Sequence, residues 1–308
     1  MSLYDVTIIG GGPAGLAAGI YSARAALKTL LLEKGMPGGL AASTEFIENY
    51  PGFAEGVGGP ELMMQMDAQA RRFGTEVQSA TAERIEAGEG CFTIHTDEGV
   101  ITTKTIILAT GAQSKKLNIP GEEEFHGRGV SYCATCDGAF FRDKEVAVIG
   151  GGNSAIEEAL YLTKFASKVH ILHRRGELRA TKILQQRALE HEKIVMHWNS
   201  VVESISGQAT VNEITVKDVR SEETKPLAVQ GIFIYVGTQP VSALVTGLIK
   251  LDERGYIITD ENMHTSQPGI FAAGDIRQKF LRQVVTAVAD GAIAAVTAEK
   301  YIEDLQKK

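Results

Sequence analysis

The chain has 308 residues and a formal net charge of −7, and its charged and hydrophobic fractions, 22% and 44%, are ordinary for a globular protein. Its 33 glycines follow no Gly-X-Y period, which excludes collagen, and the absence of a basic stripe disfavours nucleic-acid binding. No apolar run approaches the roughly 20 residues of a membrane span, and the first residues lack the basic stretch of a signal peptide. We therefore expect a cytoplasmic protein of about two domains.

The three cysteines, Cys91, Cys133 and Cys136, are too few for the disulfide framework of a small secreted protein. A closely spaced pair in a cytosolic chain more often serves redox chemistry or metal binding. A zinc site needs further ligands, and the sequence offers no second C-x-x-C and no histidine pair at ligand spacing. We therefore predict no metal, a redox-active pair at Cys133 and Cys136 that exchanges with a partner's disulfide, and a plain core or strand residue at Cys91.

Asp137 follows the second cysteine of the pair directly. A carboxyl group beside two thiols can serve as a general acid that protonates a departing thiolate. An aspartate at this position can equally cap a helix or a turn. The sequence leaves both interpretations open.

The N-terminal residues follow a strand–loop–helix–strand pattern. Residues 5–9 form a short apolar strand, Gly10-Gly11-Gly12-Pro13-Ala14-Gly15 forms the loop, and a helix of small residues is expected to about Ala26. A second strand, residues 29–32, leads to Glu33. A G-x-G-x-x-G loop in this context, with an acid at the end of the second strand, indicates a dinucleotide-binding unit.

The same pattern recurs in the middle of the chain. Residues 145–149 form a strand, Gly150-Gly151-Gly152-Asn153-Ser154-Ala155 forms the loop, a helix is expected to about Phe165, and a strand covers residues 168–172. His173 follows Gly150 by the same number of residues as Glu33 follows Gly10. Two units of equal spacing predict two dinucleotide sites.

Three further strands show how the chain is divided. Residues 106–112 close the first unit and residues 231–237 close the second, each as an apolar strand with glycine at its end. A third strand, residues 269–274, has no loop and helix of its own. We therefore expect it to complete the first sheet.

The predicted fold is α/β, with two Rossmann-like three-layer domains, the second inserted into the first. The first domain is discontinuous and consists of residues 1–112 and 245–308. The inserted domain, residues 113–244, carries the cysteine pair. Polar segments at residues 113–118 and 238–244 are the expected hinges.

The glycines of the first loop have separate roles in the predicted site. Gly10 permits the tight turn, Gly12 lets a pyrophosphate approach the backbone, and Gly15 lets the helix pack closely on the strand. The helix N-terminus then presents unpaired N–H groups to the phosphates. Glu33 accepts hydrogen bonds from ribose hydroxyls and repels a 2′-phosphate, so the ligand is FAD or NAD and not NADP.

The second loop is followed by a basic group. His173-Arg174-Arg175 stands where Glu33 stood, and Arg179 lies about one helical turn further on. Two adjacent guanidinium groups suit a 2′-phosphate, because they can offer it several N–H donors. We therefore predict NADPH as the second ligand, although charge runs of this kind are often plain solvated turns.

A second part of the first site is expected near the C-terminus. Gly274-Asp275 stands at a strand end, where the carboxylate can bond to the hydroxyls of a flavin's ribityl chain, and it can also act as a helix cap. Arg282-Gln283-Val284 opens the C-terminal helix, whose backbone N–H groups can face a flavin's pyrimidine edge.

With these motifs in hand, the sequence resembles the low-molecular-weight, bacterial-type thioredoxin reductases over essentially its whole length. The motifs that carry the resemblance are Gly10-x-Gly12-x-x-Gly15, Glu48-Asn49-Tyr50-Pro51-Gly52, Ala109-Thr110-Gly111, Cys133-Ala134-Thr135-Cys136-Asp137-Gly138, residues 150–155, His173-Arg174-Arg175-x-x-x-Arg179-Ala180, and residues 269–275 with Arg282-Gln283.

The resemblance implies a homodimeric flavoprotein that takes hydride from NADPH and passes two electrons through FAD to a Cys133–Cys136 disulfide, which then reduces thioredoxin. It implies that Cys133 attacks the partner, that Cys136 lies nearer the flavin, and that the inserted domain rotates. It also implies that Pro13, Ala14, Gly39, Leu40, Asn49, Thr110, Gly111 and Val284 belong to the FAD site, and Gly150, Gly152, Asn153 and Ser154 to the NADPH site.

Some residues depart from the family's pattern. Leu40 stands where the family usually has a glutamine near the flavin, Gly176-Glu177 follows the arginine pair, and Val241 replaces a usual asparagine. The alternatives are the same flavoprotein with another partner or donor (a hydroperoxide-reductase-type flavoprotein, a ferredoxin-fed variant or a dithiol oxidase) and a non-catalytic redox sensor. Two cofactor sites around a dithiol form a complete electron path, which favours the enzyme.

Overall fold

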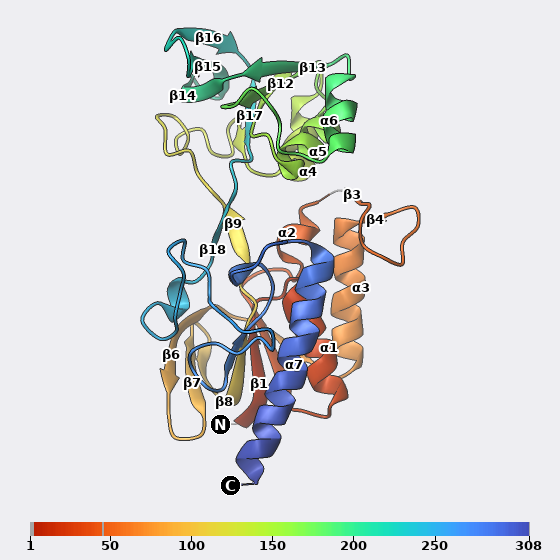
Figure 1. Ribbon diagram of the computed structural model, residues 1–308, viewed down its shortest axis with the longest axis vertical. Coiled ribbons are helices and arrows are strands. Elements are labelled where there is room, and N and C mark those ends of the chain that lie inside the picture. Colours follow the sequence, from red (N-terminus) through yellow and green to blue (C-terminus); the bar gives the residue numbers. More distant parts are fainter. Residues whose placement is uncertain (1–2, 45, 308) are drawn as a thin grey trace. The chain divides into compact units, whose positions relative to one another are not determined.

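The computed structural model describes residues 3–44 and 46–307, and the chain forms two compact units. One unit consists of Met1–Gln113 and Gln239–Lys308, and the other of Ser114–Thr238. The strands β9 (Ala112–Ser114) and β18 (Thr238–Pro240), which carry the chain from one unit to the other, pair with each other in a two-stranded sheet (Figure 1). From the sequence we expected the second crossing at residues 244–245, and the units divide earlier, within the segment expected as a hinge.

The first unit contains a sheet, short loop elements and three helices longer than ten residues among its described residues. Its elements are β1 (Leu3–Ile9), α1 (Pro13–Arg24), β2 (Thr29–Glu33), α2 (Gly39–Ala42), β3 (Phe46–Ile47), β4 (Val57–Gly58), α3 (Gly59–Arg72), β5 (Glu76–Ser79), β6 (Ala82–Ala87), β7 (Phe92–Thr96), β8 (Gly99–Leu108), η2 (Ala243–Val245), β19 (Ile270–Ala272), η3 (Gly274–Ile276) and α7 (Val284–Gln306).

The sheet of the first unit has a parallel part and an antiparallel extension. Strands β5, β2, β1 and β8 are parallel neighbours in that order, and β19 runs parallel to the end of β8. The pairing of Ile270 with Ile106 confirms that residues 269–274 complete the first sheet. Strands β7 and β6 continue the sheet as antiparallel neighbours of β8. Helices α1, α3 and α7 share one apolar core and lie side by side in Figure 1.

The second unit is built on a parallel sheet among its described residues. Its elements are β10 (Val130–Ser131), α4 (Ala134–Asp137), η1 (Gly138–Phe141), β11 (Glu145–Ile149), α5 (Asn153–Leu162), β12 (Lys168–His173), α6 (Lys182–Leu189), β13 (Ile194–Trp198), β14 (Ser200–Gly207), β15 (Val211–Asp218), β16 (Thr224–Ala228) and β17 (Gly231–Ile234).

The parallel sheet of the second unit has the order β10-β17-β11-β12-β13. One of its faces forms a core with α5 and α6, and the other with the antiparallel sheet β14-β15-β16. The strand predicted at residues 145–149 is confirmed as β11, and the strand at 168–172 is β12, one residue longer. Each unit therefore has the layers of an α/β dinucleotide-binding fold.

The two glycine turns have the same local geometry. Gly10 and Gly150 have φ of +108° and +150°, a region that glycine enters without steric cost. Their N–H groups donate to Leu32 O at 2.8 Å and to Leu172 O at 3.1 Å. A Cβ on Gly10 would collide with the carbonyl oxygen of Ala109, and a Cβ on Gly150 with that of Tyr235, so each turn rests on the end of the unit's closing strand.

Two helices differ from the sequence expectation. Helix α1 ends at Arg24 rather than Ala26, because Ala26 has φ +59°, which takes it out of the right-handed helix. Helix α5 ends at Leu162 rather than Phe165. Helix α3 was not assigned from the sequence, although the Gly-Pro start at Gly59 is a helix-start signal that could have found it.

Helix α7 is the longest helix in the described part of the chain, with 23 residues. It begins at a capping box in which the side chains of Gln283 and Thr286 bond to each other's backbone N–H groups. Within residues 3–44 and 46–307, neither this helix nor another is long and apolar enough to cross a membrane.

A polar cluster connects three strands of the second sheet. His170 on β12 is buried, with its Nε2 2.9 Å from a carboxylate oxygen of Glu145 and its Nδ1 2.9 Å from Nε2 of His197 on β13. Lys168 Nζ donates to the other Glu145 oxygen at 3.1 Å. Burial, followed by the charges of His170 and Lys225, lowers the pKa of His197 to about 4. His197 therefore stays neutral in the folded chain at mildly acidic pH.

We predict that the free energy of unfolding of the second unit falls as the pH is lowered from about 6.5, the ordinary histidine value, towards 4. In this window the unfolded chain binds a proton on His197 that the folded chain does not bind, so acid favours unfolding. Urea unfolding followed by the fluorescence of Trp198, the chain's single tryptophan, measures this dependence.

The variant His197→Asn should flatten the dependence, and the control His126→Gln, at an exposed position, should not. If His197→Asn kept the wild-type dependence of the unfolding free energy on pH, His197 would not be the group responsible for it.

Candidate active site

The two cysteines of the C-x-x-C motif form a disulfide with Cα atoms 5.3 Å apart; Cys133 directly precedes the short helix α4, and Cys136 lies within it. Cys136 is exposed and Cys133 is half-buried. Cys133 is the N-cap of α4, and its Sγ accepts the backbone N–H of Cys136 at 3.1 Å. A donor aimed at this sulfur favours a thiolate on Cys133 once the disulfide is reduced.

The backbone around the disulfide is fixed by two further side chains. The Ser131 hydroxyl accepts the N–H of Cys133 at 3.0 Å and lies 3.2 Å from its carbonyl oxygen. The Tyr235 hydroxyl accepts the N–H of Ala134, between the two cysteines, at 2.8 Å. Burial raises the pKa of Tyr235, and the charges of Glu158 and Asp137 raise it further, so this phenol stays neutral. Sequence reasoning missed both side chains, because neither belongs to a motif.

Asp137 is half-buried and is the last residue of α4. Its N–H donates to the carbonyl oxygen of Cys133 at 3.2 Å, and its charge acts on the Tyr235 hydroxyl. The backbone of Asp137 is therefore tied to Cys133, and its carboxyl group is close enough to Tyr235 to act on that hydroxyl through its charge.

The first glycine loop leads into helix α1, whose first residues are Pro13 and Ala14. Its N-cap residue, Gly12, has no side-chain capping bond, so no side chain of the described residues caps the first N–H groups. A Cβ on Gly12 would meet only Gly39, at 4.0 Å, whereas a Cβ on Gly15 would collide with the Gly10 carbonyl. The loop is thus open at Gly12 and tightly packed at Gly15, as a pyrophosphate-binding turn requires.

Glu33 lies directly beside this loop. One of its carboxylate oxygens accepts the N–H of Gly11 at 2.7 Å, and the other accepts the N–H of Gly35 at 3.2 Å. The Gly38 N–H donates to Gly11 O at 2.8 Å, which brings the Gly38–Gly39 turn against the loop. Leu40 follows in α2 and is half exposed.

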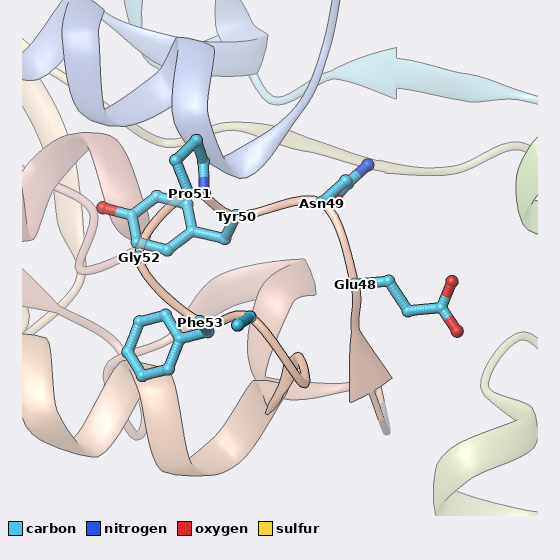
Figure 2. A pocket seen from close by; sticks show the side chains of 7 residues that line it. Glu48, Asn49, Tyr50, Pro51, Gly52 and Phe53 are labelled. Carbon is cyan, nitrogen blue, oxygen red and sulfur yellow. The ribbon is translucent and has the colours of Figure 1, made fainter.

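The loop of residues 48–54 lines an open pocket of about 510 Å³. Figure 2 shows the rings of Tyr50 and Phe53 on one side of the loop and the carboxylate of Glu48 pointing away from them. Asn49 Nδ2 donates to Gln283 Oε1 at 3.1 Å, so the structure brings together two predicted site residues that are far apart in the sequence. Gln283 also caps α7, which begins at Val284.

Other predicted residues of the first unit lie just after strands β8 and β19. The Thr110 hydroxyl donates to Val241 O at 2.7 Å, and Gly111, with φ +67°, faces open space. A Cβ on Gly274 would lie 2.8 Å from the Cβ of Ala14, which shows how closely η3, after β19, approaches α1.

Two polar atoms of this region are buried without a hydrogen-bond partner among the described residues: Asp275 Oδ1 and Arg282 Nε. Burial raises the pKa of Asp275, against the opposing charges of Lys279 and Arg282. Arg282 also lies over the ring of Tyr256, with 4.0 Å to the centroid. Buried polar groups normally have partners, so these atoms favour a polar ligand here.

The second glycine loop has the same form. Gly152 is the N-cap of α5, has no side-chain capping bond and faces open space, and the exposed Ser154 lies in the first turn. Asn153 Oδ1 accepts the N–H of Thr181 at 2.8 Å, and Gly151 O accepts the N–H of Arg179 at 2.7 Å. The arginine-containing segment is therefore fastened to the loop.

His173 differs from its basic neighbours. It is buried, and its ring lies so close to Gly151 that a Cβ there would collide with it. Burial, with the charges of Arg179, Arg175 and Arg174, lowers the pKa of His173. The three arginines are exposed, and none forms an ion pair with a carboxylate among the described residues. The guanidinium groups, rather than the imidazole, are thus available to an anion.

Both loops therefore fit a dinucleotide. Each has a helix N-terminus without a side-chain cap, a glycine that leaves space for a phosphate, and polar groups that a ligand would satisfy. The acid beside the first loop and the arginines beside the second favour different ribose substituents.

Comparison with known proteins agrees with this geometry. The family described as "Pyridine nucleotide-disulphide oxidoreductase" matches residues 4–291. Thioredoxin reductase from Peptoclostridium litorale is 50% identical, over 99% of this chain and 98% of the relative, and that from Bacillus subtilis (strain 168) is 48% identical, over 99% and 96%. The crystal structure of Lactococcus lactis thioredoxin reductase (FR conformation) matches with a TM-score of 0.96 and 52% identity, over 98% of this chain and 99% of that one.

The chain therefore belongs to the pyridine nucleotide-disulphide oxidoreductases and, within them, to the thioredoxin reductases.

Proposed function

We propose that this chain reduces the disulfide of thioredoxin with electrons that pass from NADPH through FAD to the Cys133–Cys136 disulfide. The observation that carries the proposal is a disulfide with one exposed cysteine, at C-x-x-C spacing, in a chain with two dinucleotide-binding loops. Its relatives of about half-identical sequence are named thioredoxin reductases, which supports thioredoxin as the partner.

FAD is assigned to the first unit, residues 1–112 and 245–308 by the sequence boundaries. The first loop, the Glu33 carboxylate and the unpartnered Asp275 Oδ1 support this, because they offer donors for phosphates and acceptors for ribose and ribityl hydroxyls. Asn49, Gln283 and Val284 would lie at the flavin end of the same site.

NADPH is assigned to the inserted unit. The support is the second loop with the exposed Arg174, Arg175 and Arg179, which can bind a 2′-phosphate through several N–H donors. The buried His173 would support the loop from beneath rather than contact the phosphate.

FAD and NADPH together supply two electrons to the disulfide when they are bound. Reduction breaks the Cys133–Cys136 bond. The Cys133 thiolate, stabilised by the Cys136 N–H, then attacks a sulfur of thioredoxin's disulfide, forms a mixed disulfide and releases one partner thiolate. Cys136 attacks Cys133 Sγ, re-forms the internal bond and releases the second partner thiolate, so bonds and electrons balance.

Asp137 would act as the proton donor to a departing thiolate in this exchange. Its place at the end of α4, in the cluster with Tyr235, supports this role. The Tyr235 and Ser131 hydroxyls would hold the backbone so that the two sulfur atoms meet again after each exchange.

We also propose a cytoplasmic homodimer. The exposed Val285, Ile293 and Val296 follow each other at a spacing that places them on one side of α7, where a second copy would cover them. A dithiol that NADPH keeps reduced belongs in a reducing compartment.

The cysteine pair gives the first test of the proposed function. Cys133→Ser or Cys136→Ser should reduce NADPH-dependent reduction of thioredoxin by at least about a thousandfold, because the exchange needs both sulfur atoms. FAD should stay bound and should still be reduced by NADPH, as measured by flavin absorbance.

The matched control is Cys91→Ser, the free cysteine of the first unit, which should keep wild-type activity. Full thioredoxin reduction by Cys133→Ser, or an inactive Cys91→Ser, would count against the proposal.

The arginine pair tests the choice of coenzyme. Replacing Arg174 and Arg175 by alanine should raise the KM for NADPH by about a hundredfold, because charge-assisted hydrogen bonds to the phosphate are lost, and should leave the KM for NADH nearly unchanged. Arg187→Ala, an exposed arginine on α6, is the control. Equal losses for the two coenzymes would show that these arginines do not bind a 2′-phosphate.

A further inference from the structure

A buried ionic cluster lies beneath the segment that carries the second part of the proposed FAD site. Asp290, in the second turn of α7, is 7% exposed. Its carboxylate accepts three hydrogen bonds: from the Gly274 N–H at 3.0 Å, from Arg277 Nη1 at 2.9 Å and from Lys279 Nζ at 2.7 Å. One side chain on the helix thus holds three positions of one irregular segment.

The cationic partners are buried as well. The side chains of Arg277 and Lys279 are 14% and 8% exposed. Arg277 also donates from Nε to Thr259 Oγ1 at 2.8 Å, so both of its bonds fix its position. Asp290 is the shared anionic partner of both cations. Removing it would leave two uncompensated charges in a poorly solvated place.

The segment that Asp290 holds runs from the end of β19 to the start of α7. It contains Asp275 and Arg282, whose side chains each have a buried polar atom without a partner in the described part of the chain. Asp290 also acts on Asp275 through its charge, since its negative charge helps to raise the pKa of that carboxyl group. The cluster is therefore coupled to the proposed site both by hydrogen bonds and by electrostatics.

We propose that Asp290 is a positioning residue of the flavin site, which holds Gly274, Arg277 and Lys279 in place and sets the net charge of this segment. This inference rests on the proposed assignment of FAD to the first unit. Asp290, Arg277 and Lys279 together carry one net positive charge. Reduction of a flavin adds negative charge, so each positive charge added to the cluster favours the reduced form, and each one removed favours the oxidised form.

The test compares Asp290→Asn, Lys279→Gln and the double variant with the wild type. Asp290→Asn keeps the shape of the side chain and removes its charge, so the midpoint potential of bound FAD should become more positive. Lys279→Gln should shift it in the opposite direction, and the double variant should return it towards the wild-type value. A purely structural role predicts no such opposite shifts. The potential is measured anaerobically against a redox dye.

The second readout is FAD affinity, measured by flavin fluorescence on adding FAD to the apoprotein. Asp290→Asn should bind FAD about tenfold more weakly, because the segment loses an anchor. Asp304→Asn, an exposed aspartate of the same helix, is the control and should change neither quantity.

Wild-type potential and affinity in Asp290→Asn, together with an unchanged potential in Lys279→Gln, would overturn the role of Asp290 while leaving the proposed function intact. Should Asp290→Asn fail to retain FAD, the potential of Lys279→Gln decides alone. A wild-type chain that binds no FAD contradicts the proposed function, and the role of Asp290 with it.

Discussion

Each unit is built around one glycine turn that leads from a strand to a helix. At Gly10 and Gly150 the chain turns from strand to helix directly against the carbonyl oxygen at the end of the closing strand, where no Cβ fits. Two residues further on, Gly12 and Gly152 are N-caps without a side-chain bond, which leaves each helix N-terminus open to phosphates. The same short glycine loop therefore serves both packing and the proposed ligand binding.

On this shared frame the two units carry different chemistry. The first loop is bordered by a carboxylate that bonds to its backbone. The second is bordered by exposed arginines, of which Arg179 donates its backbone N–H to Gly151 O. The redox disulfide occurs in the second unit alone, just before its first loop, where Tyr235 from the closing strand holds α4. Tyr235 thus supports the dinucleotide turn with its carbonyl group and the backbone at the disulfide with its hydroxyl group.

The features that could be predicted from the sequence are those with a local pattern. Strand β11 and the cysteine pair follow from spacing within a few residues, and β19 from the lack of a loop and helix of its own. Tyr235 and Ala134 are 101 residues apart in the sequence. Asp290 and Gly274 are closer but belong to no common motif, so no local pattern predicts either contact. His173 stands next to two exposed arginines in the sequence, and its burial depends on the approach of Gly151, which only the fold determines.

In the proposed function, electrons pass from NADPH through bound FAD to the Cys133–Cys136 disulfide. An anaerobic titration of the purified chain with NADPH, followed by flavin absorbance with and without oxidised thioredoxin, tests it most directly. We expect the flavin to bleach and about two equivalents of NADPH to be consumed for each chain, because the flavin and the disulfide each take two electrons. Added thioredoxin should restore the flavin absorbance. A chain whose flavin is absent, or stays oxidised in excess NADPH, would contradict it.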